Sequence, residues 1–390
     1  MSDPIVIVGA GLAGYNLARE FRKLDAETPL VVVSRDGAGF YSKPMLSNAL
    51  AGKKTAASLV MKPAEKMADE LKAQVLPRVT VQAVDAAART VTLSSGDTLR
   101  YRDLVLALGA DQLRLPLQGD AADTVVSVND LDDFAAFADA LDKGPMGEPV
   151  QRVAILGGGL IGCEFANDLL HREIKATVID IAERALPRLL PPAASARLQK
   201  ALEAGGAAFR FGTSVTNIAR GDGALRLTLS DGSTLEADLV VSAIGLKPRT
   251  ELAAQAGAEL ARGVKVNREL ATSVPHVHAL GDCAEVEGLL LPYVMPLMQQ
   301  ARALAATLAG KPTPVSYPAM PVVVKTPACP TVVCPPAMGA EGEWQVTETD
   351  EALEARFVSA SQPEQMLGFV LQGKATAQRQ AWAAQTPAVL

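Results

Sequence analysis

Two segments of the chain combine an apolar run with glycines spaced G-x-G-x-x-G. They are PIVIVGAGLAGYNLAREF and VAILGGGLIGCEFANDL, and their glycines are Gly9, Gly11, Gly14, Gly157, Gly159 and Gly162. In such a motif the first glycine permits a tight turn, and the second lets the backbone approach a pyrophosphate. The third lets the following helix pack on the strand. Because each match follows a strand-like run, the sequence predicts two dinucleotide-binding loops.

An acidic residue at the end of the second strand of such a unit recognises the ribose of the nucleotide. The first unit offers Asp36 in PLVVVSRDG, and the second offers Asp180 in KATVIDIAER. A carboxylate accepts hydrogen bonds from ribose hydroxyls and repels a 2′-phosphate, so the second unit is expected to prefer NADH to NADPH. Arg184 leaves NADPH open as an alternative, and the alternative for Asp36 is an ordinary turn aspartate.

The strands and hairpins expected around these loops also occur twice. The segment TVTLSSGDTLRYRDLVLALGA (90–110) resembles RLTLSDGSTLEADLVVSAIGL (226–246). Both predict a hairpin followed by a buried strand that ends in a glycine, Gly109 or Gly245. Each half is therefore expected to be a βαβ-type nucleotide-binding unit with a small antiparallel insertion.

The chain changes character after the second unit. HALGDCAE suggests a strand followed by Gly281 and Asp282, and an apolar helix is expected from about Pro296 to Gly310. Residues 317–390 begin with a segment rich in proline and valine, and they predict a small α+β domain. The predicted fold is α/β, with two Rossmann-like dinucleotide-binding domains and a small α+β C-terminal domain.

Length and composition restrict the class of protein. The chain has 390 residues, of which 49% are hydrophobic, a net charge of −6 and four cysteines. This length allows two or three hydrophobic cores, and the charge does not predict nucleic-acid binding. No apolar run reaches about 18 residues and the first one contains the loop glycines, so neither a membrane span nor a signal peptide is expected. Few cysteines in a long chain indicate a reducing compartment, and we expect a soluble cytoplasmic protein without a metal site.

The cysteines do not suggest a thiol relay. Cys163 and Cys283 lie within glycine motifs, where a small buried residue is the simpler interpretation. Cys329 and Cys334 have the spacing Cys-x4-Cys, but on an extended strand their Cα atoms would lie about 16 Å apart. A disulfide needs Cα atoms within about 7 Å. Only a turn at Pro330 could close that gap, so a redox role of this pair stays open.

The two-loop pattern resembles the flavoprotein pyridine nucleotide-disulfide oxidoreductase superfamily over nearly the whole chain. The resemblance implies tightly bound FAD in residues 1–117 and 246–316, NADH in residues 118–245, and a separate C-terminal domain in residues 317–390. Carried over to this sequence, the residues implied to contact FAD are Gly9, Ala10, Gly11, Leu12, Ala13, Gly14, Ser34, Asp36, Lys43, Pro44, Val81, Gly109, Glu164, Gly281, Asp282, Val294, Met295 and Lys325. Those implied to contact NADH are Gly157, Gly159, Leu160, Ile161, Gly162, Asp180 and Gly245.

The segment YSKPMLS stands where several members of that superfamily carry redox cysteines. It resembles the Tyr-x-Lys/Arg-Pro-x-Leu-Ser motif of reductases that serve small iron proteins. The resemblance implies that Lys43 lies beside the flavin ring and Glu164 opposite, as the catalytic pair. A cation there can stabilise negative charge as hydride arrives, and Glu164 can hold that cation in place. The alternative is a surface lysine and a glutamate at a helix start. Leu108 departs from the superfamily pattern, since a threonine is usual there.

Longer segments narrow the resemblance to bacterial rubredoxin-NAD⁺ reductases. They include NLAREFRKLDAETPL, VMPLMQQARALAATLAG and PVVVKTPACPTVV. The resemblance implies an NADH-dependent flavoprotein that passes electrons through FAD one at a time to rubredoxin and supplies an alkane hydroxylase system. It also implies that Lys325 reaches the flavin from the C-terminal domain. A reductase of flavorubredoxin or of an oxygenase ferredoxin is an alternative, as is a flavin-based NADH sensor or scaffold.

An acidic rubredoxin would associate faster with a basic edge. The candidate docking edge consists of Lys53, Lys54, Lys62 and Lys66, and its alternative is a plain solvated helix face. Because the C-terminal domain is short, we expect a monomer that forms a transient complex with rubredoxin and does not insert into a membrane.

Overall fold

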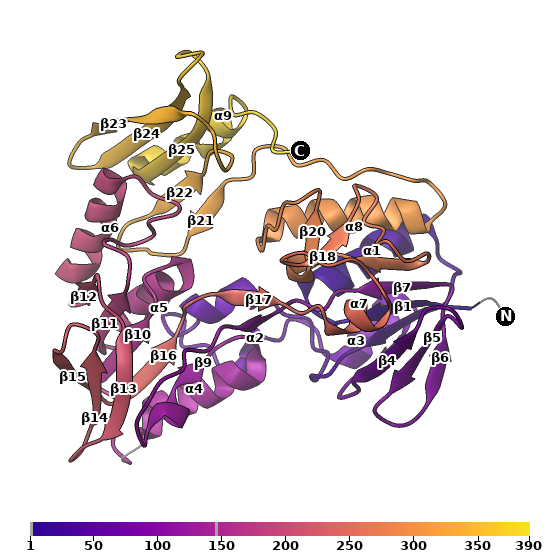
Figure 1. Ribbon diagram of the computed structural model, residues 1–390, viewed down its shortest axis with the longest axis horizontal. Helices are drawn as coiled ribbons and strands as arrows, with labels where there is room; N and C mark the ends of the chain where they lie inside the picture. The colour runs from indigo at the N-terminus through magenta and orange to yellow at the C-terminus, as the bar shows by residue number, and fades with distance from the viewer. Residues whose placement is uncertain (1–2, 145–146) are drawn as a thin grey trace.

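The computed structural model describes residues 3–144 and 147–390, which form three five-stranded sheets and several smaller ones (Figure 1). The first two large sheets are parallel and belong to the repeated units. The third, near the C-terminus, is antiparallel. The predicted α/β fold, with two Rossmann-like units and a small C-terminal domain, is confirmed.

The first sheet has the strand order β19-β7-β1-β2-β3. Its strands are β1 (Ile5–Val8), β2 (Leu30–Val33), β3 (Gln74–Leu76), β7 (Asp103–Leu106) and β19 (Val277–Ala279). Helices α1 (Leu12–Leu24) and α8 (Val294–Leu308) pack against each other, and α3 (Ala64–Leu71) packs beside β3. Because helices cover the sheet, the central strands IVIV and LVVV are buried throughout, which explains their continuous apolar runs. Helix α8 begins and ends slightly earlier than expected.

The second sheet repeats this arrangement, with the strand order β12-β11-β10-β16-β9. Its strands are β9 (Val126–Ser127), β10 (Arg152–Leu156), β11 (Lys175–Asp180), β12 (Ala208–Phe211) and β16 (Leu239–Ser242). Its helices are α4 (Leu131–Lys143), α5 (Leu160–Leu170) and α6 (Pro192–Ala204). None of the helices in the two described ranges is long and apolar enough to cross a membrane.

Each unit carries a small antiparallel sheet before its last central strand. In the first unit this sheet consists of β4 (Val81–Asp85), β5 (Thr90–Leu93) and β6 (Thr98–Arg100). In the second unit it consists of β13 (Val215–Arg220), β14 (Leu225–Leu229) and β15 (Thr234–Ala237). The hairpins predicted from the internal repeat are therefore confirmed.

Shorter elements connect the units. The ribbon of β8 (Ala110–Gln112) and β17 (Leu246–Pro248) joins the segment that enters the second unit to the one that leaves it. The others are η1 (Lys43–Asn48), α2 (Ala56–Leu59), η2 (Ala122–Thr124), α7 (Glu251–Gln255), β18 (Val264–Val266), η3 (Gly281–Cys283) and β20 (Ala284–Val286).

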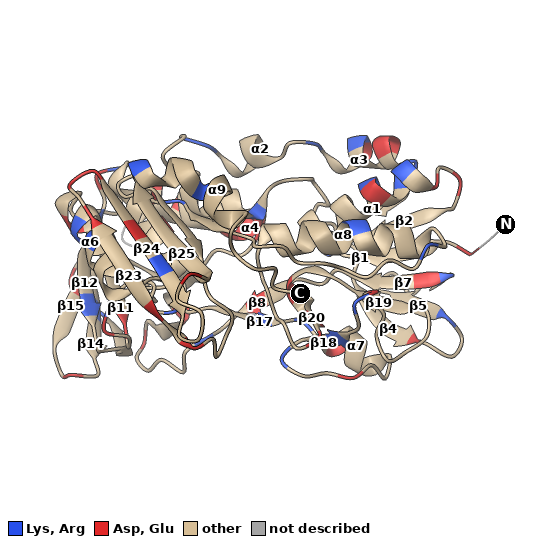
Figure 2. Cartoon of the chain, turned by 90° about the horizontal axis from the view of Figure 1, so that it is seen from above, with Lys and Arg blue, Asp and Glu red and all other residues tan. Residues whose placement is uncertain are grey.

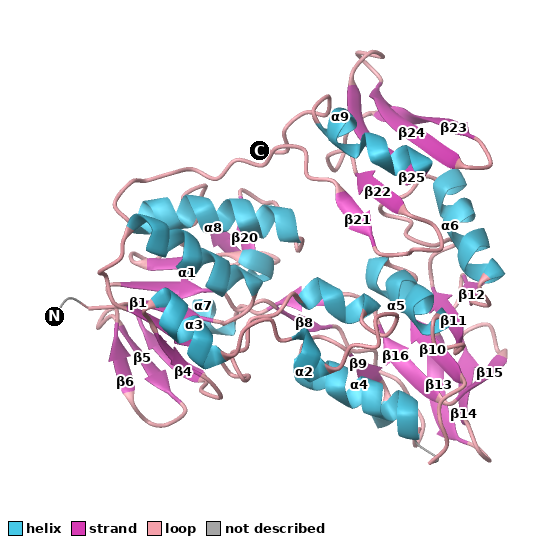
Figure 3. Ribbon diagram, turned by 180° about the vertical axis from the view of Figure 1, so that it is seen from behind, coloured by secondary structure: helices cyan, strands magenta, loops and turns pink. Residues whose placement is uncertain are grey.

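The C-terminal sheet has the order β21-β22-β25-β24-β23 and lies over the second unit. Its strands are β21 (Val322–Val324), β22 (Thr331–Cys334), β23 (Gly342–Glu348), β24 (Ala352–Ser359) and β25 (Met366–Gly373), followed by η4 (Lys374–Gln378) and α9 (Arg379–Ala383). An extended segment leads to it from α8 (Figure 1). Helices α5 and α6 lie between this sheet and the second sheet (Figure 3). Cys163, Leu198 and Val333 share one buried cluster there.

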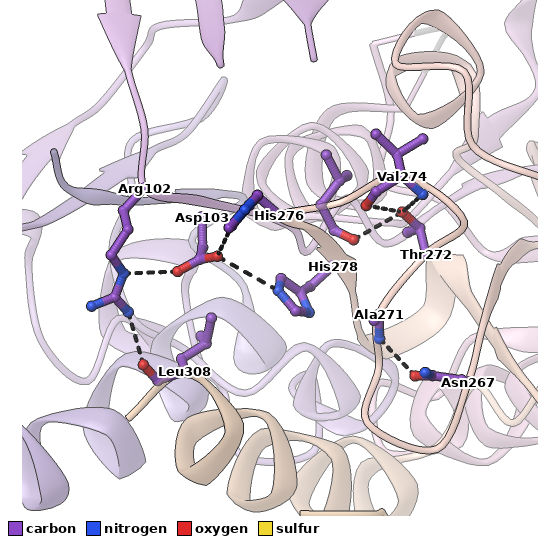
Figure 4. Close-up of polar contacts among 10 residues, drawn as sticks. Arg102, Asp103, Asn267, Ala271, Thr272, Val274, His276, His278 and Leu308 are labelled. Atoms are coloured by element: carbon purple, nitrogen blue, oxygen red, sulfur yellow. Dashed lines mark hydrogen bonds and ion pairs between the residues drawn. The ribbon is translucent and has the colours of Figure 1, made fainter. Parts of the chain in front are cut away.

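Asp103 joins the distant strand β19 to the amino end of β7 (Figure 4). Its Oδ1 lies 3.1 Å from Nδ1 of His276 and 3.9 Å from Nε2 of His278. Its Oδ2 accepts a hydrogen bond from Nε of Arg102 at 2.8 Å. Burial raises the pKa of Asp103, but the polar contacts with His278, Arg102 and His276 outweigh it and hold the pKa well below its ordinary value. This cluster fixes β19 beside β7, and the other end of β19 leads into residues 281–282.

Candidate functional site

The first glycine loop joins β1 to α1 and forms an open backbone cradle. Gly9 has a φ of +119°, and a Cβ there would lie 2.2 Å from the carbonyl oxygen of Ala107. A Cβ on Gly14 would lie 1.9 Å from the carbonyl oxygen of Gly9, whereas one on Gly11 would meet nothing within 4 Å. No side chain caps α1, so its first amide groups are available to a phosphate. The remaining loop residues are Ala10, Leu12 and Ala13. Gly9 and Gly14 leave no room for a side chain, whereas the backbone at Gly11 is open to a ligand. This combination fits a bound dinucleotide.

The second loop repeats this geometry between β10 and α5. Gly157 has a φ of +106°, and its Cβ would lie 2.6 Å from the carbonyl oxygen of Ala243. A Cβ on Gly162 would lie 1.9 Å from the carbonyl oxygen of Gly157, and one on Gly159 would again meet nothing within 4 Å. Helix α5 also lacks a side-chain cap. Its first residues are Leu160 and Ile161, and Gly245 follows β16 with a φ of +121°. This loop therefore fits a second dinucleotide.

Both predicted ribose acids lie just after or at the end of a second strand. Oδ1 of Asp36 accepts a hydrogen bond from Oγ of Ser34 at 2.7 Å. Oδ2 of Asp180 accepts from the backbone amide of Gly158 at 2.5 Å, and its Oδ1 accepts from that of Ala182 at 2.8 Å. Asp180 is thus held against the second glycine loop. The ribose contact of each acid stays a prediction.

Lys43 lies at the start of η1, with Pro44 in its first turn. Its Nζ donates to Oδ1 of Asn129 at 2.6 Å, so the prediction that Glu164 holds this cation is wrong. Burial lowers the pKa of Lys43, while the negative charge of Asp282 opposes that effect. The expected ion pair does not form because Asn129, just before α4, accepts a hydrogen bond from the Lys43 ammonium. Another lysine, Lys325, pairs with Glu164 instead.

Glu164 is fully buried on α5 and holds groups from two other segments. Its Oε2 lies 2.5 Å from Oγ of Ser47 and 2.5 Å from Nζ of Lys325. Its Oε1 accepts from the backbone amide of Lys325 at 2.9 Å. Lys325 directly follows β21, so one carboxylate joins η1, α5 and the C-terminal sheet. The structure thus brings both catalytic candidates and Lys325 to one region but pairs them differently from the prediction.

The start of α8 provides an apolar platform near these charges. Val294 and Met295 are its first residues, 40% and 41% exposed, and no side chain caps the helix. Large apolar side chains at an uncapped helix start fit the flat ring and the anionic edge of a flavin. Burial raises the pKa of Asp282, and the charge of Lys43 opposes it. Gly281 precedes Asp282 with a φ of +79°.

One further residue belongs to this region, and sequence reasoning missed it. Arg249 donates from Nη1 to the carbonyl of Leu108 at 2.6 Å, and its Nη2 lies 2.5 Å from Oδ1 of Asp111. The antiparallel pairing of β17 with β8 brings Arg249 beside Gly109, which has a φ of +69°. No motif in the sequence marks this arginine. Val81 is buried at the start of β4, and its role toward FAD stays a prediction.

All four cysteines are free and buried. Burial raises the pKa of Cys163 to about 12 and that of Cys283 to about 11. Burial also raises the pKa of Cys334, to about 11, and that of Cys329. The thiols are therefore protonated at neutral pH and unreactive, and Cys329 and Cys334 form no disulfide.

The candidate docking edge is exposed but only partly basic. Lys53, Lys54, Lys62 and Lys66 all face solvent. Lys62 forms an ion pair with Glu70 at 2.5 Å, and residues of both signs are mixed along α1 and α3 (Figure 2). The docking role of this edge stays a prediction.

Known proteins match both parts of this architecture. Residues 3–306 match the family described as pyridine nucleotide-disulphide oxidoreductase, and residues 314–386 match a rubredoxin binding C-terminal domain. The rubredoxin-NAD(+) reductase of Alcanivorax borkumensis is 49% identical over 388 residues, which cover 99% of each chain. That of Acinetobacter baylyi is 47% identical over 382 residues, which cover 97% of this chain and 95% of the relative.

A solved structure agrees with these sequence matches. A ferredoxin reductase from Rhodopseudomonas palustris is 26% identical with a TM-score of 0.88, and the match covers 99% of this chain and 96% of that one. The chain therefore belongs to the pyridine nucleotide-disulphide oxidoreductase family and, within it, to the rubredoxin-NAD(+) reductases.

Proposed function

We propose that the protein transfers electrons from NADH through FAD to rubredoxin, one electron at a time. The ion pair of Glu164 with Lys325, at 2.5 Å, carries this proposal. Glu164 lies on the helix that begins at the second glycine loop, and Lys325 lies in the segment that matches the rubredoxin binding domain. The segment expected to bind the acceptor and the helix expected to bind the donor thus meet at one buried carboxylate.

We assign the cofactors of the family to the two glycine loops. FAD would lie in a domain made of residues 1–117 and 246–316, and NADH in residues 118–245. Residues 317–390 would form the domain that receives rubredoxin. When bound, FAD supplies the chemistry that accepts hydride from NADH and releases electrons singly, which matches a two-electron donor to a one-electron acceptor. The residues assigned to each cofactor are those given in the sequence analysis, and Arg249 is added to the FAD set.

The side chains assigned to the proposed flavin position place charge beside it and include no reactive thiol. Lys43 and the start of α8 contribute positive potential where electrons arrive. The buried cysteines have raised pKa values, which disfavours electron transfer through thiols. Electrons would therefore pass directly to an external iron protein.

Acceptor specificity tests this proposal. We would measure kcat/KM for rubredoxin, a flavorubredoxin and a plant-type ferredoxin under anaerobic conditions, with NADH and with NADPH as donors. We expect kcat/KM to be highest for rubredoxin with NADH as the donor. A higher value for ferredoxin or flavorubredoxin would reassign the partner. If a charge-transfer absorption persists and no acceptor is reduced, the NADH sensor would be the better interpretation.

We further propose that the protein is a cytoplasmic monomer that supplies an alkane hydroxylase system. The short C-terminal domain supports the monomer, because the interface of dimeric disulfide reductases lies in a larger C-terminal region. Light scattering coupled to size-exclusion chromatography measures the mass directly, and a dimer mass would refute this part.

A further inference from the structure

We propose that Asn129 is a positioning residue that presents Lys43 to the flavin site as a cation without a carboxylate partner. This inference rests on the proposed function and deepens it, because it assigns different tasks to the two lysines of the site. Lys43 would stabilise the negative charge that arrives there, and Lys325 would serve to join the C-terminal domain to Glu164.

The hydrogen bonds of Asn129 fix its orientation. The residue lies between β9 and α4 and is 8% exposed. Its Nδ2 donates to the carbonyl of Ala110 at 3.0 Å, and its backbone amide donates to Oδ2 of Asp133 at 2.8 Å. A carbonyl only accepts and an ammonium only donates, so the amide has one arrangement that satisfies both neighbours. Oδ1 must therefore face Nζ of Lys43, 2.6 Å away.

The two lysines differ in how their charge is compensated. Lys325 touches the Glu164 carboxylate, whereas no carboxylate within residues 3–144 and 147–390 forms an ion pair with Lys43. Asp282 is near enough to influence the charge of Lys43 without pairing with it. The amide of Asn129 thus satisfies one N–H of Lys43 and leaves its positive charge available.

That distinction matters for electron transfer. A preorganised cation stabilises negative charge that develops beside it in a partly buried site. A carboxylate in contact with the ammonium would cancel much of that field, because the two opposite charges would act on the flavin at nearly the same distance. A neutral acceptor at position 129 holds the cation without this loss.

The variant Asn129→Asp tests the inference, since it keeps the size of the side chain and adds a negative charge beside Lys43. We expect the two-electron midpoint potential of bound FAD to fall, with a change of about tenfold in the reduction equilibrium, or about 30 mV. The rate of flavin reduction at saturating NADH should fall, while FAD content and KM for NADH change little. Spectroelectrochemistry gives the potential, and stopped flow gives the rate.

Asn267→Asp is the matched control. Oδ1 of Asn267 accepts from the backbone amide of Ala271 at 3.0 Å on an exposed turn, and a carboxylate can keep that bond (Figure 4). The potential of this variant should equal that of the wild type. If Asn129→Asp does not retain FAD, the neutral but shorter Asn129→Ser replaces it, and a smaller fall in potential is expected because the ammonium loses its fixed position.

Combination with Lys43→Gln decides whether Asn129 acts through Lys43. Lys43→Gln should lower the potential by itself, and adding Asn129→Asp should then lower it much less than in the wild-type background. An unchanged potential in FAD-loaded Asn129→Asp or Asn129→Ser overturns the inference, as does an equal effect in both backgrounds. These potentials are measured without an acceptor. A wild-type protein that fails to reduce rubredoxin would therefore refute the proposed function separately.

Discussion

Replacing Glu164 by glutamine should loosen the C-terminal domain from the rest of the protein. The carboxylate accepts from Ser47 at 2.5 Å, from the Lys325 ammonium at 2.5 Å and from its backbone amide at 2.9 Å. Glutamine keeps one acceptor oxygen, and its amide group would face an ammonium that can only donate. Breaking a fully buried pair costs about 3–5 kcal/mol. Because the Lys325 side chain is 23% exposed and water can solvate it, we expect a loss of about 2–3 kcal/mol in the free energy of unfolding.

Urea unfolding followed by tryptophan fluorescence measures this loss. The chain contains 2 tryptophans, Trp344 on β23 and Trp382 on α9, and both report on the C-terminal domain. Glu348→Gln is the matched control, because it breaks an exposed ion pair with Arg197, 3.0 Å long, between α6 and the same domain. That change should cost less than about 1 kcal/mol. If Glu164→Gln costs no more than Glu348→Gln, the reasoning about the buried carboxylate is refuted.

Two glycines and two aspartates yield four more predictions. Gly9→Ala should destabilise the protein by about 2 kcal/mol or more in urea unfolding, because its φ is +119° and a Cβ would meet a backbone oxygen at 2.2 Å. Gly11→Ala should leave the stability of the apoprotein within about 0.5 kcal/mol but weaken FAD binding in fluorescence titrations, and equal stability losses for both variants would contradict this. Asp180→Ala should raise KM for NADH at least about tenfold and reduce the preference over NADPH in steady-state kinetics, whereas an unchanged KM would remove Asp180 from the ribose site. Asp103→Asn should lower stability at pH 7. A carboxyl with a lowered folded-state pKa stabilises the protein fully above its unfolded pKa, so the difference from wild type should shrink as the pH falls below about 4 and vanish near the lower folded-state value, whereas a constant difference would contradict this.

Much of the fold could be predicted because its constraints are local. A glycine loop needs glycine at Gly14 and Gly162 for reasons that lie within a strand, a turn and a helix, and the spacing records them directly. The repeated hairpins at 90–110 and 226–246 likewise carry their own alternation of apolar and polar residues.

The pairing of the charged groups could not be predicted, because it depends on contacts between distant segments. Lys43 meets Asn129 across 86 positions, and Glu164 meets Lys325 across 161. A lysine and a glutamate expected near one cofactor suggest an ion pair, but which cation reaches the carboxylate is decided by how the C-terminal sheet packs on α5. Arg249 was missed for the same reason, since the short β8–β17 ribbon brings it to Gly109.

A stoichiometric stopped-flow experiment shows where the electrons go. FAD-loaded protein is mixed anaerobically with limiting NADH and excess oxidised rubredoxin, and the iron absorbance of rubredoxin is followed with that of the flavin. We expect rapid reduction of two rubredoxin molecules for each NADH consumed, with slow reduction of a plant-type ferredoxin under the same conditions. A flavin that stays reduced while rubredoxin remains oxidised would contradict it.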